Sequence, residues 1–255
     1  MADVEMHPDL RTQYDGYYDD GRSEWRRLGA IDKAANVITL CRDIPVSSIL
    51  EIGAGDGAVL SRLSELGFGD ELSAAEISSS GVSVIERRAI PRLVDCRTFD
   101  GYRLPWTAGR FDLAIMTHVL EHVEHPRQIL REAARVARYL FIEVPTEDIS
   151  RRPKDYTPDS VGHLNFFSPR TIRWLVQSCG LRVLAQMTTN PSRAVHAYQG
   201  GLTGVIRHHT KGALLRWLPG FATRHFCYHE AVLATRSGED AAGQSRQARP
   251  PEAGR

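Results

Sequence analysis

The chain alternates short β-branched or aliphatic runs with amphipathic segments, and this alternation restricts its fold more than any other feature. Apolar spacings of three and four predict a first helix from about Ser23 to Cys41. Strands that alternate with helices imply a parallel sheet covered on both faces. The predicted strands are Val46–Ile52, Glu71–Ile77, Arg92–Phe99, Phe111–Val119 and Tyr139–Val144, and the helices between them are Gly57–Leu66, Ser79–Arg88 and Pro126–Ala137.

The remaining segments extend this pattern. Ser168 and Pro169 begin a helix that Gly180 ends, and Leu181–Met187 follows as a strand. An insertion at 188–224 contains a predicted helix near Leu202–Leu218, and His225–Thr235 is the last strand. We therefore predict a doubly wound, mostly parallel seven-stranded α/β sheet with an antiparallel last strand. The domain spans 22–236, between an irregular arm at 1–21 and a tail at 237–255 that is expected to be disordered.

Composition excludes several classes of protein. The 255 residues are 42% hydrophobic and 25% charged, with mean hydropathy −0.30, and no apolar run approaches the roughly 20 residues that span a bilayer. The first residues lack the basic and apolar segments of a secretory signal, so we expect a cytoplasmic protein. Four well-separated cysteines indicate neither a disulfide framework nor a zinc ribbon.

Charge is unevenly distributed, although the net charge is only +1. Residues 160–229 contain eight basic side chains and no Asp or Glu. This stretch would favour an anionic partner if its basic groups share a face, and it is a fluctuation of composition if they do not.

Three glycines stand at alternate positions directly after the first predicted strand: Gly53, Gly55 and Gly57. Glycine allows the backbone to turn sharply and approach a ligand, and the helix behind the turn offers free N–H groups. Glu76 ends the second strand, where an acidic side chain can accept hydrogen bonds from both hydroxyls of a ribose.

The spacing and Glu51 argue against a nicotinamide dinucleotide. The glycines follow G-x-G-x-G rather than G-x-G-x-x-G, and Glu51 places a carboxylate where a pyrophosphate would lie. A carboxylate there suits a cofactor with a cationic part, such as a sulfonium and an amino group. An NAD-dependent oxidoreductase stays a less favoured alternative.

On these motifs the sequence resembles the class I S-adenosylmethionine-dependent methyltransferases that act on small molecules, over roughly Trp25 to Leu184. The resemblance implies that Glu51–Gly57 holds the methionine part of S-adenosylmethionine and that Glu76 binds its ribose. It also implies that Asp100, with Asp95 as its rival, contacts the adenine amino group. Ile77 and Gly101, each next to a stronger candidate, are secondary contacts with the cofactor.

The resemblance also places candidate catalytic residues. His118 follows the fourth predicted strand and faces the expected methyl site, and His163 lies in the connection after the fifth strand; either could deprotonate or orient a hydroxyl. The absence of Asn-Pro-Pro-Tyr or Asp-Pro-Pro-Tyr after the fourth strand argues against methylation of DNA bases. We expect a small acceptor methylated on oxygen, anionic because of basic groups in the insertion, namely Arg193, Arg207, Lys211, Arg216 and Arg224.

Two other interpretations remain open. His118-Val119-Leu120-Glu121-His122 fits H-x-x-E-H, the zinc-hydrolase pattern, but that site needs both histidines on one face of a helix. These residues follow a strand-like run, so we assign no metal site. A non-catalytic module that binds nucleic acid or protein through its basic C-terminal half is the second alternative.

Overall fold

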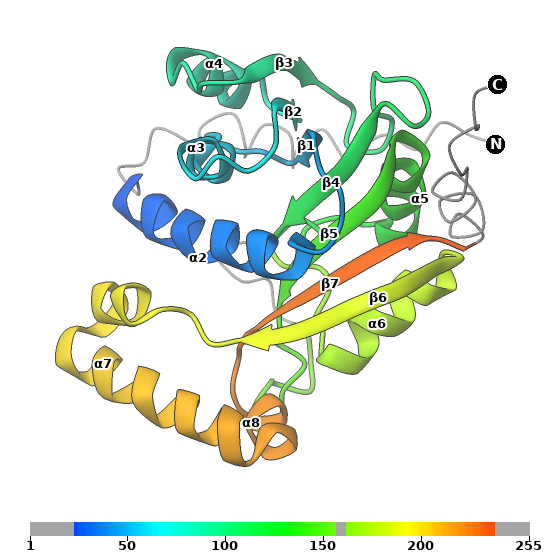
Figure 1. Cartoon of the computed structure of the whole chain (residues 1–255). Coiled ribbons are helices and arrows are strands. Elements are labelled where there is room, and N and C mark those ends of the chain that lie inside the picture. Colours follow the sequence, from blue (N-terminus) through cyan, green and yellow to red (C-terminus); the bar gives the residue numbers. More distant parts are fainter. Residues whose placement is uncertain (1–22, 157–161, 238–255) are drawn as a thin grey trace, which may run out of the picture.

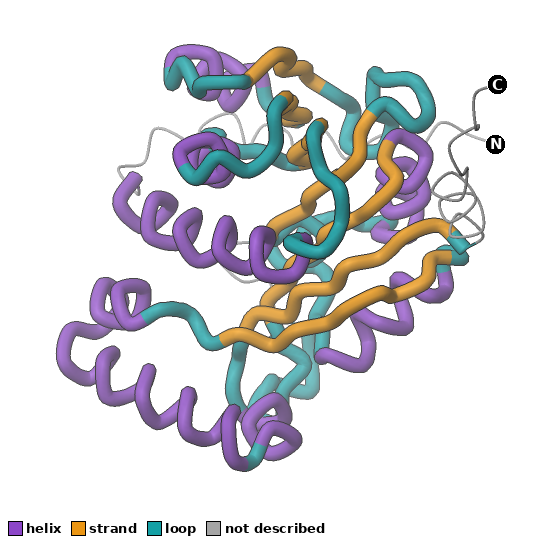
Figure 2. Tube along the Cα trace, viewed as in Figure 1, coloured by secondary structure: helices purple, strands orange, loops and turns teal. Residues whose placement is uncertain are grey.

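The computed structural model describes residues 23–156 and 162–237, which form a seven-stranded sheet with helices on both sides (Figures 1 and 2). The strands are β1 (Ser48–Ile52), β2 (Glu71–Glu76), β3 (Leu93–Thr98), β4 (Phe111–Thr117), β5 (Ala137–Pro145), β6 (Leu181–Thr189) and β7 (His229–Arg236). The helices are α2 (Ser23–Cys41), α3 (Ala58–Glu65), α4 (Ser79–Arg87), α5 (Pro126–Val136), α6 (Pro169–Ser178), α7 (Arg193–Trp217) and α8 (Pro219–His225).

The strand order is β3-β2-β1-β4-β5-β7-β6. β1 to β5 pair in parallel, whereas β7 runs antiparallel to both β5 and β6, for example with Ile142 opposite Val232. The predicted doubly wound sheet with an antiparallel last strand is therefore confirmed. The order reverses between β1 and β4, which is where open α/β sheets bind ligands.

Side chains of β4 show how the two faces of the sheet are covered. Leu113 and Ile115 pack in a cluster with α2, α3 and α4, whereas Ala114 and Met116 pack with α5 and α6. Successive side chains of a strand point to opposite faces, so a continuous apolar run is what a strand buried on both faces requires.

The predicted helix starts rest on identifiable caps. The Ser168 side chain accepts a hydrogen bond from Thr171 N at 3.3 Å, and Thr171 Oγ1 accepts one from Ser168 N at 2.8 Å. Pro126 stands at the start of α5, where its missing N–H costs no helical bond. Both helices begin where the sequence predicted.

The insertion differs from its prediction. α7 begins at Arg193 rather than near Leu202, and Gly200 and Gly201 interrupt it with non-helical backbone angles. α8 then occupies 219–225, so β7 starts at His229 and the predicted first residues of that strand were wrong. Pro219 stands at the first position of α8 and favours a helix there. The sequence analysis did not use this signal and extended the last strand back to His225.

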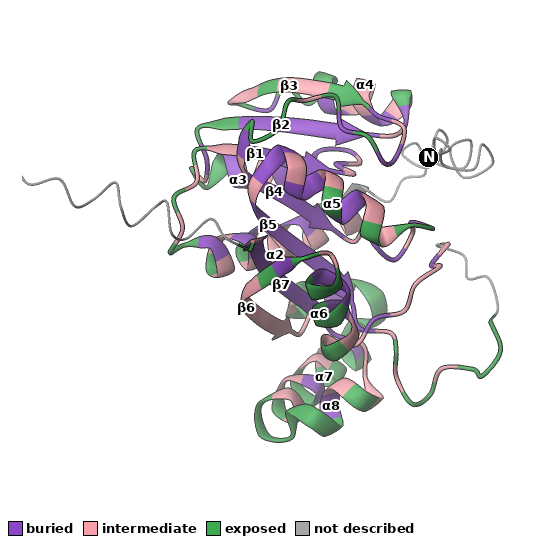
Figure 3. Cartoon of the chain, turned by 90° about the vertical axis from the view of Figure 1, so that its right-hand side faces the viewer, coloured by how far each residue is buried: buried purple, intermediate pink, exposed green. Residues whose placement is uncertain are grey.

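The insertion lies at one end of the sheet, next to α2 (Figure 1). Trp25 of α2 stacks on Tyr198 of α7 at 6.0 Å, and Asp32 accepts a hydrogen bond from Ser192 N at 2.7 Å. Much of α7 and α8 is exposed, whereas the inner strands β1, β2, β4, β5 and β7 are mostly buried (Figure 3).

The predicted arm at 1–21 and nearly all of the predicted tail lie outside the described residues. Among the helices in 23–156 and 162–237, none combines the length and apolar character needed to cross a bilayer.

Candidate functional site

A cavity of about 1240 Å³ lies at the carboxyl ends of β1, β2, β4 and β5. The glycine turn after β1 forms one part of its wall, the turn after β4 another, and α2, α7 and the segment after α8 close the rest. Its lining includes Glu51, Gly53, Gly55, Glu76, Ile77 and Gly101, as well as both candidate histidines, His118 and His163. All the predicted site residues except Asp100 therefore border one space.

The glycine turn has the backbone geometry that its sequence demands. Gly53, Gly55 and Gly57 all have positive φ, at 71°, 60° and 73°, where a side chain would be strained. The N–H groups of Gly53 and Ala54 donate to Ala75 O of β2 at 2.8 and 3.1 Å, which fixes the turn beside the second strand. A Cβ on Gly53 would come within 2.8 Å of Val119 Cγ2, so glycine keeps the turn close to β4.

Glu76 sits at the end of β2 with only 2% of its surface exposed. Its Oε2 accepts a hydrogen bond from Gly55 N at 2.8 Å, and its Oε1 accepts one from Ser78 N at 3.2 Å. The Glu76 carboxylate is therefore bonded to the glycine turn, and both line the cavity.

Glu51 is the last but one residue of β1 and is 1% exposed. Its Oε2 has no hydrogen-bond partner among the described residues, although it is buried. Burial raises the pKa of Glu51 to about 8; the Lys33 ammonium opposes this shift, and the carboxylates of Asp56 and Glu76 add to it. A cationic group in the cavity would compensate for the cost of ionising this carboxyl.

Asp100 and its alternative Asp95, the two residues predicted to contact adenine, do not line the cavity. Asp100 Oδ1 accepts hydrogen bonds from Tyr102 N and Arg103 N at 2.8 and 2.6 Å. Asp95 bonds to Trp106 Nε1 at 3.0 Å and pairs with Arg97. Asp100 therefore stabilises the loop that carries Gly101, and Gly101 lines the cavity.

His118 follows β4 in a left-handed backbone conformation, with φ of 61°. Burial, the Lys33 ammonium and the His229 imidazole hold the pKa of His118 well below its usual range, which leaves the ring neutral. Because this turn is not helical, His118 and His122 do not form the paired face that H-x-x-E-H requires. The zinc-hydrolase interpretation therefore lacks its structural basis.

His163 lies in the connection that packs under the β4–α5 turn. The N–H groups of Leu164 and Asn165 donate to Glu121 O, and Asn165 Nδ2 donates to Leu120 O and Val123 O. His163 Nδ1 lies 2.7 Å from Glu147 Oε2, so a carboxylate orients the ring.

The predicted basic groups of the insertion divide into two sets. Arg207 and Lys211 line the cavity, whereas Arg193, Arg216 and Arg224 do not. Lys211 is 8% exposed and lies 4.7 Å from the centre of the Tyr228 ring, and burial lowers its pKa.

Sequence reasoning missed three acidic or imidazole groups. Glu147, after β5, and His229, at the start of β7, line the cavity, and Glu143 of β5 lies behind the lining in contact with His229. Glu143 is fully buried, and its Oε1 lies 3.4 Å from His118 Nε2 and 3.4 Å from His229 Nδ1. Burial favours protonated Glu143, but the two facing imidazoles outweigh it and hold the pKa of the carboxyl well below its usual range. The sequence did offer one signal for Glu143, because a carboxylate inside an otherwise apolar strand indicates a functional or paired group.

Residues 23–186 match the family model described as a methyltransferase domain. No curated protein sequence matches the chain. Three solved structures share its fold at low sequence identity. The [4+2]-cyclase SpnF is 16% identical, with 80% of each chain covered and a TM-score of 0.58.

The other two structures are methyltransferases. A geranyl diphosphate methyltransferase in complex with GPP and sinefungin is 14% identical, with 80% of this chain and 77% of that chain covered and a TM-score of 0.57. The Haemonchus contortus phosphoethanolamine N-methyltransferase 2, in complex with phosphomonomethylethanolamine and S-adenosylhomocysteine, is 12% identical, with 88% and 60% covered and a TM-score of 0.57. The match over most of the domain, the strand order and the glycine turn lead to one conclusion: the chain belongs to the class I S-adenosylmethionine-dependent methyltransferases and is an enzyme that uses this cofactor.

Proposed function

We propose that the protein transfers a methyl group from S-adenosylmethionine to an oxygen of a small anionic acceptor held in the same cavity. The observation that carries the proposal is the lining and size of this cavity. The glycine turn, Glu51 and Glu76 belong to its lining, and so do His163, Arg207 and Lys211. At about 1240 Å³ the cavity exceeds the roughly 300–1,000 Å³ of most single-ligand pockets, so it has room for a donor and an acceptor together.

The residues beside the glycine turn fit S-adenosylmethionine. Its ribose hydroxyls suit the Glu76 carboxylate, and its amino and sulfonium groups suit Glu51, whose buried Oε2 has no hydrogen-bond partner in the described structure. Gly53 and Gly55 line the cavity at positive φ, where a glycine backbone can approach a ligand closely. Ile77 and Gly101 also line the cavity, and we propose that they contact the adenosine part of the cofactor. Asp100 shapes the loop that carries Gly101, so a direct contact of Asp100 with the adenine amino group remains a prediction.

When bound, S-adenosylmethionine supplies an electrophilic methyl group whose transfer breaks the carbon–sulfur bond and forms the carbon–oxygen bond. His163 accepts the proton of the acceptor hydroxyl, and Glu147 holds the ring in position and stabilises the resulting imidazolium. His118 lines the same cavity and its ring is neutral. Walls that exclude water align donor and acceptor, which contributes to catalysis independently of the base.

The charge of the acceptor is proposed from Arg207 and Lys211. Both face the cavity from α7, and the nearby Arg151 lines it from the connection after β5. A buried ammonium such as that of Lys211 gains stabilisation from an anion beside it. Two structural relatives are seen with phosphate-bearing molecules, GPP and phosphomonomethylethanolamine, which supports the same class of acceptor.

The experiment is mass spectrometry of acceptors incubated with the protein and deuterated-methyl S-adenosylmethionine. Acceptors are tested in pairs that share a hydroxyl and differ only in the presence of a phosphate or carboxylate. We expect a labelled methyl on the oxygen of the anionic member, formed more slowly by the Glu76→Ala variant at the same low donor concentration. Labelling of nitrogen or carbon only, or equal turnover of the neutral member, would contradict the oxygen or the anionic assignment respectively.

A further inference from the structure

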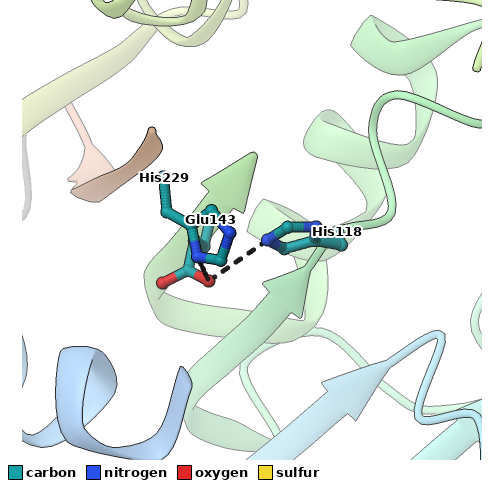
Figure 4. Close-up of side chains that lie close together, drawn as sticks. All are labelled: His118, Glu143 and His229. Carbon is teal, nitrogen blue, oxygen red and sulfur yellow. Dashed lines mark ion pairs between the residues drawn. The ribbon is translucent and has the colours of Figure 1, made fainter. Parts of the chain in front are cut away.

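Three side chains from separate strands converge on one point next to the cavity (Figure 4). His118 follows β4, Glu143 lies within β5, and His229 is the first residue of β7. Oε1 of Glu143 is 3.4 Å from both His118 Nε2 and His229 Nδ1, and the two imidazole rings meet edge to face with centres 4.5 Å apart. One carboxylate oxygen thus faces two imidazole nitrogens.

The three facing atoms are buried and unsatisfied. His118 Nε2, Glu143 Oε1 and His229 Nδ1 have no hydrogen-bond partner among the described residues, and 3.4 Å is longer than an ordinary N–H···O hydrogen bond of 2.7–3.2 Å. Buried polar atoms nearly always have a partner. The cluster therefore lacks a group that would join these three atoms.

The distances suit a metal ion as that group. Zinc binds nitrogen and carboxylate oxygen at roughly 2.0–2.2 Å in a tetrahedron, whose ligand atoms are then about 3.4 Å apart. Both distances from Glu143 Oε1 equal this edge, and all three atoms lie within 4.8 Å of one another. Two imidazoles and a carboxylate are a ligand set for divalent zinc, iron, manganese or cobalt.

Glu143 is held from behind as outer partners hold metal ligands. Asn36 Nδ2 donates to Glu143 Oε2 at 2.7 Å, which leaves Oε1 directed at the two rings. Glu121 Oε1 lies 3.4 Å from His118 Nδ1 without a hydrogen bond, so a second carboxyl group stands on the far side of that ring. His118 and His229 also line the cavity, which leaves one side of the cluster open to a small molecule.

We propose that His118, Glu143 and His229 bind one divalent transition-metal ion, with a coordination position open to the cavity. This binding site goes beyond the proposed methyl transfer and does not depend on it. If the acceptor occupies the cavity, the ion would bind its oxygen, and His118 would serve as a ligand rather than as a base. The sequence analysis assigned no metal site because the H-x-x-E-H residues follow a strand-like run. It did not consider Glu143 and His229, which are distant from that segment in sequence.

A neighbouring triad of Glu121, His122 and His163 is a weaker candidate. His122 Nδ1 lies 3.3 Å from Gly162 O, and His163 Nδ1 lies 2.7 Å from Glu147 Oε2. These two ring nitrogens have hydrogen-bond partners in the protein, although both carboxyl oxygens of Glu121 do not. All three facing atoms of the first cluster lack a hydrogen-bond partner in the described structure.

The test is a titration of chelator-treated full-length protein with Co²⁺, followed by visible absorption, and with Zn²⁺, followed by calorimetry, both without donor or acceptor. We expect one ion per chain. Glu143→Gln and His229→Ala should each weaken binding by more than the roughly 10- to 100-fold that loss of an outer partner costs. His125→Gln, which removes an exposed histidine on another surface, should leave affinity and absorption unchanged.

Circular dichroism and S-adenosylmethionine affinity verify that each variant is folded. If a cluster variant does not fold, His229→Asn is tested in its place. The proposal is overturned if the wild type binds no ion, or if both cluster variants bind as tightly as the wild type. It is also overturned if binding is lost only with His163→Ala, which would place the ion at the neighbouring triad. Because no methyl donor is present, these outcomes are independent of the proposed reaction.

Discussion

Glu76 accepts a hydrogen bond from Gly55 N at 2.8 Å although 21 positions separate the two residues. This bond joins the end of β2 to the glycine turn, so the Glu76 carboxylate stabilises the turn at the place where we propose that the ribose binds. Hydrogen bonds to charged groups contribute about 1.5–3 kcal/mol each. We expect Glu76→Ala to weaken S-adenosylmethionine binding by about 10- to 100-fold, measured by calorimetry.

Glu71→Ala is the matched control, because Glu71 lies at the opposite end of the same strand in an exposed pair with Arg110. It should leave the affinity unchanged. Wild-type affinity in Glu76→Ala would show that the ribose lies elsewhere.

Gly53 offers a test of the close approach between the glycine turn and β4. Gly53→Ala places a Cβ within 2.8 Å of Val119 Cγ2 at a positive φ, whereas Gly109→Ala meets nothing within 4 Å at a similar φ of 67°. Both variants should lose about 1–2 kcal/mol of unfolding free energy from backbone strain. Only Gly53→Ala should lose more, and only it should bind S-adenosylmethionine more weakly.

Denaturant unfolding and calorimetry measure the two quantities. Gly53→Ala combined with Val119→Ala should recover part of the lost stability, since it removes the colliding methyl group. Equal losses of stability and affinity at Gly53 and Gly109 would refute the role of this contact.

Glu51 predicts a pH dependence of cofactor binding. Its pKa is raised to about 8 in the free protein, by burial first and by Asp56 and Glu76 in addition, against Lys33. A cationic ligand favours the ionised carboxylate, so binding near pH 7 should release a proton. Affinity should then rise with pH, by close to tenfold per unit between about pH 6 and 7.5. Calorimetry in buffers of different ionisation enthalpy counts the proton.

Glu51→Gln is the control for this titration, because an amide keeps the shape of the side chain but cannot ionise. Its affinity should be weaker at pH 7.5 and nearly independent of pH. A variant with the same slope as the wild type would assign the proton to another group.

The glycine turn and the helix caps show what the sequence can predict. Positive φ at Gly53, Gly55 and Gly57 follows from local requirements that only glycine meets, and the Ser168 cap of α6 is fixed by residues a few positions apart. The mostly parallel sheet was predicted from the alternation of apolar runs, because parallel strands need crossover helices. Local chemistry was therefore sufficient to predict the fold class and the glycine turn.

The acceptor side could not be predicted in the same way. His118, Glu143 and His229 meet only because β7 inserts between β5 and β6, a pairing that places Pro145 opposite His229. Glu143 was hidden in an apolar strand, and His229 was assigned to a strand that began four residues too early. Contacts between segments distant in sequence bring these three residues together, and the spacing of residues within one segment does not predict such contacts.

His163 is expected to act as the base through its ring, held by Glu147 at 2.7 Å. His163→Gln should lower kcat by about 10²- to 10⁴-fold and leave cofactor affinity unchanged. Glu147→Gln, which leaves the ring in place but weakens its support, should cause a smaller loss. A more acidic acceptor, such as a phenol in place of an alcohol, should reduce both losses, because it needs less help to release its proton. Losses that do not depend on the acidity of the acceptor would indicate a structural role only.

Lys211 provides the test of acceptor charge. It faces the cavity from α7, 8% exposed, and its Nζ lies over the Tyr228 ring. Lys211→Met retains most of the side-chain volume but removes the positive charge, so it should raise KM for the anionic acceptor by about 10- to 100-fold, as expected for loss of one charged contact. KM for the matched neutral acceptor should not rise. Arg216→Met, in the same helix but outside the cavity lining, should change neither value, and an equal effect of Lys211→Met on both acceptors would mean that this ammonium shapes the cavity instead of recognising a charge.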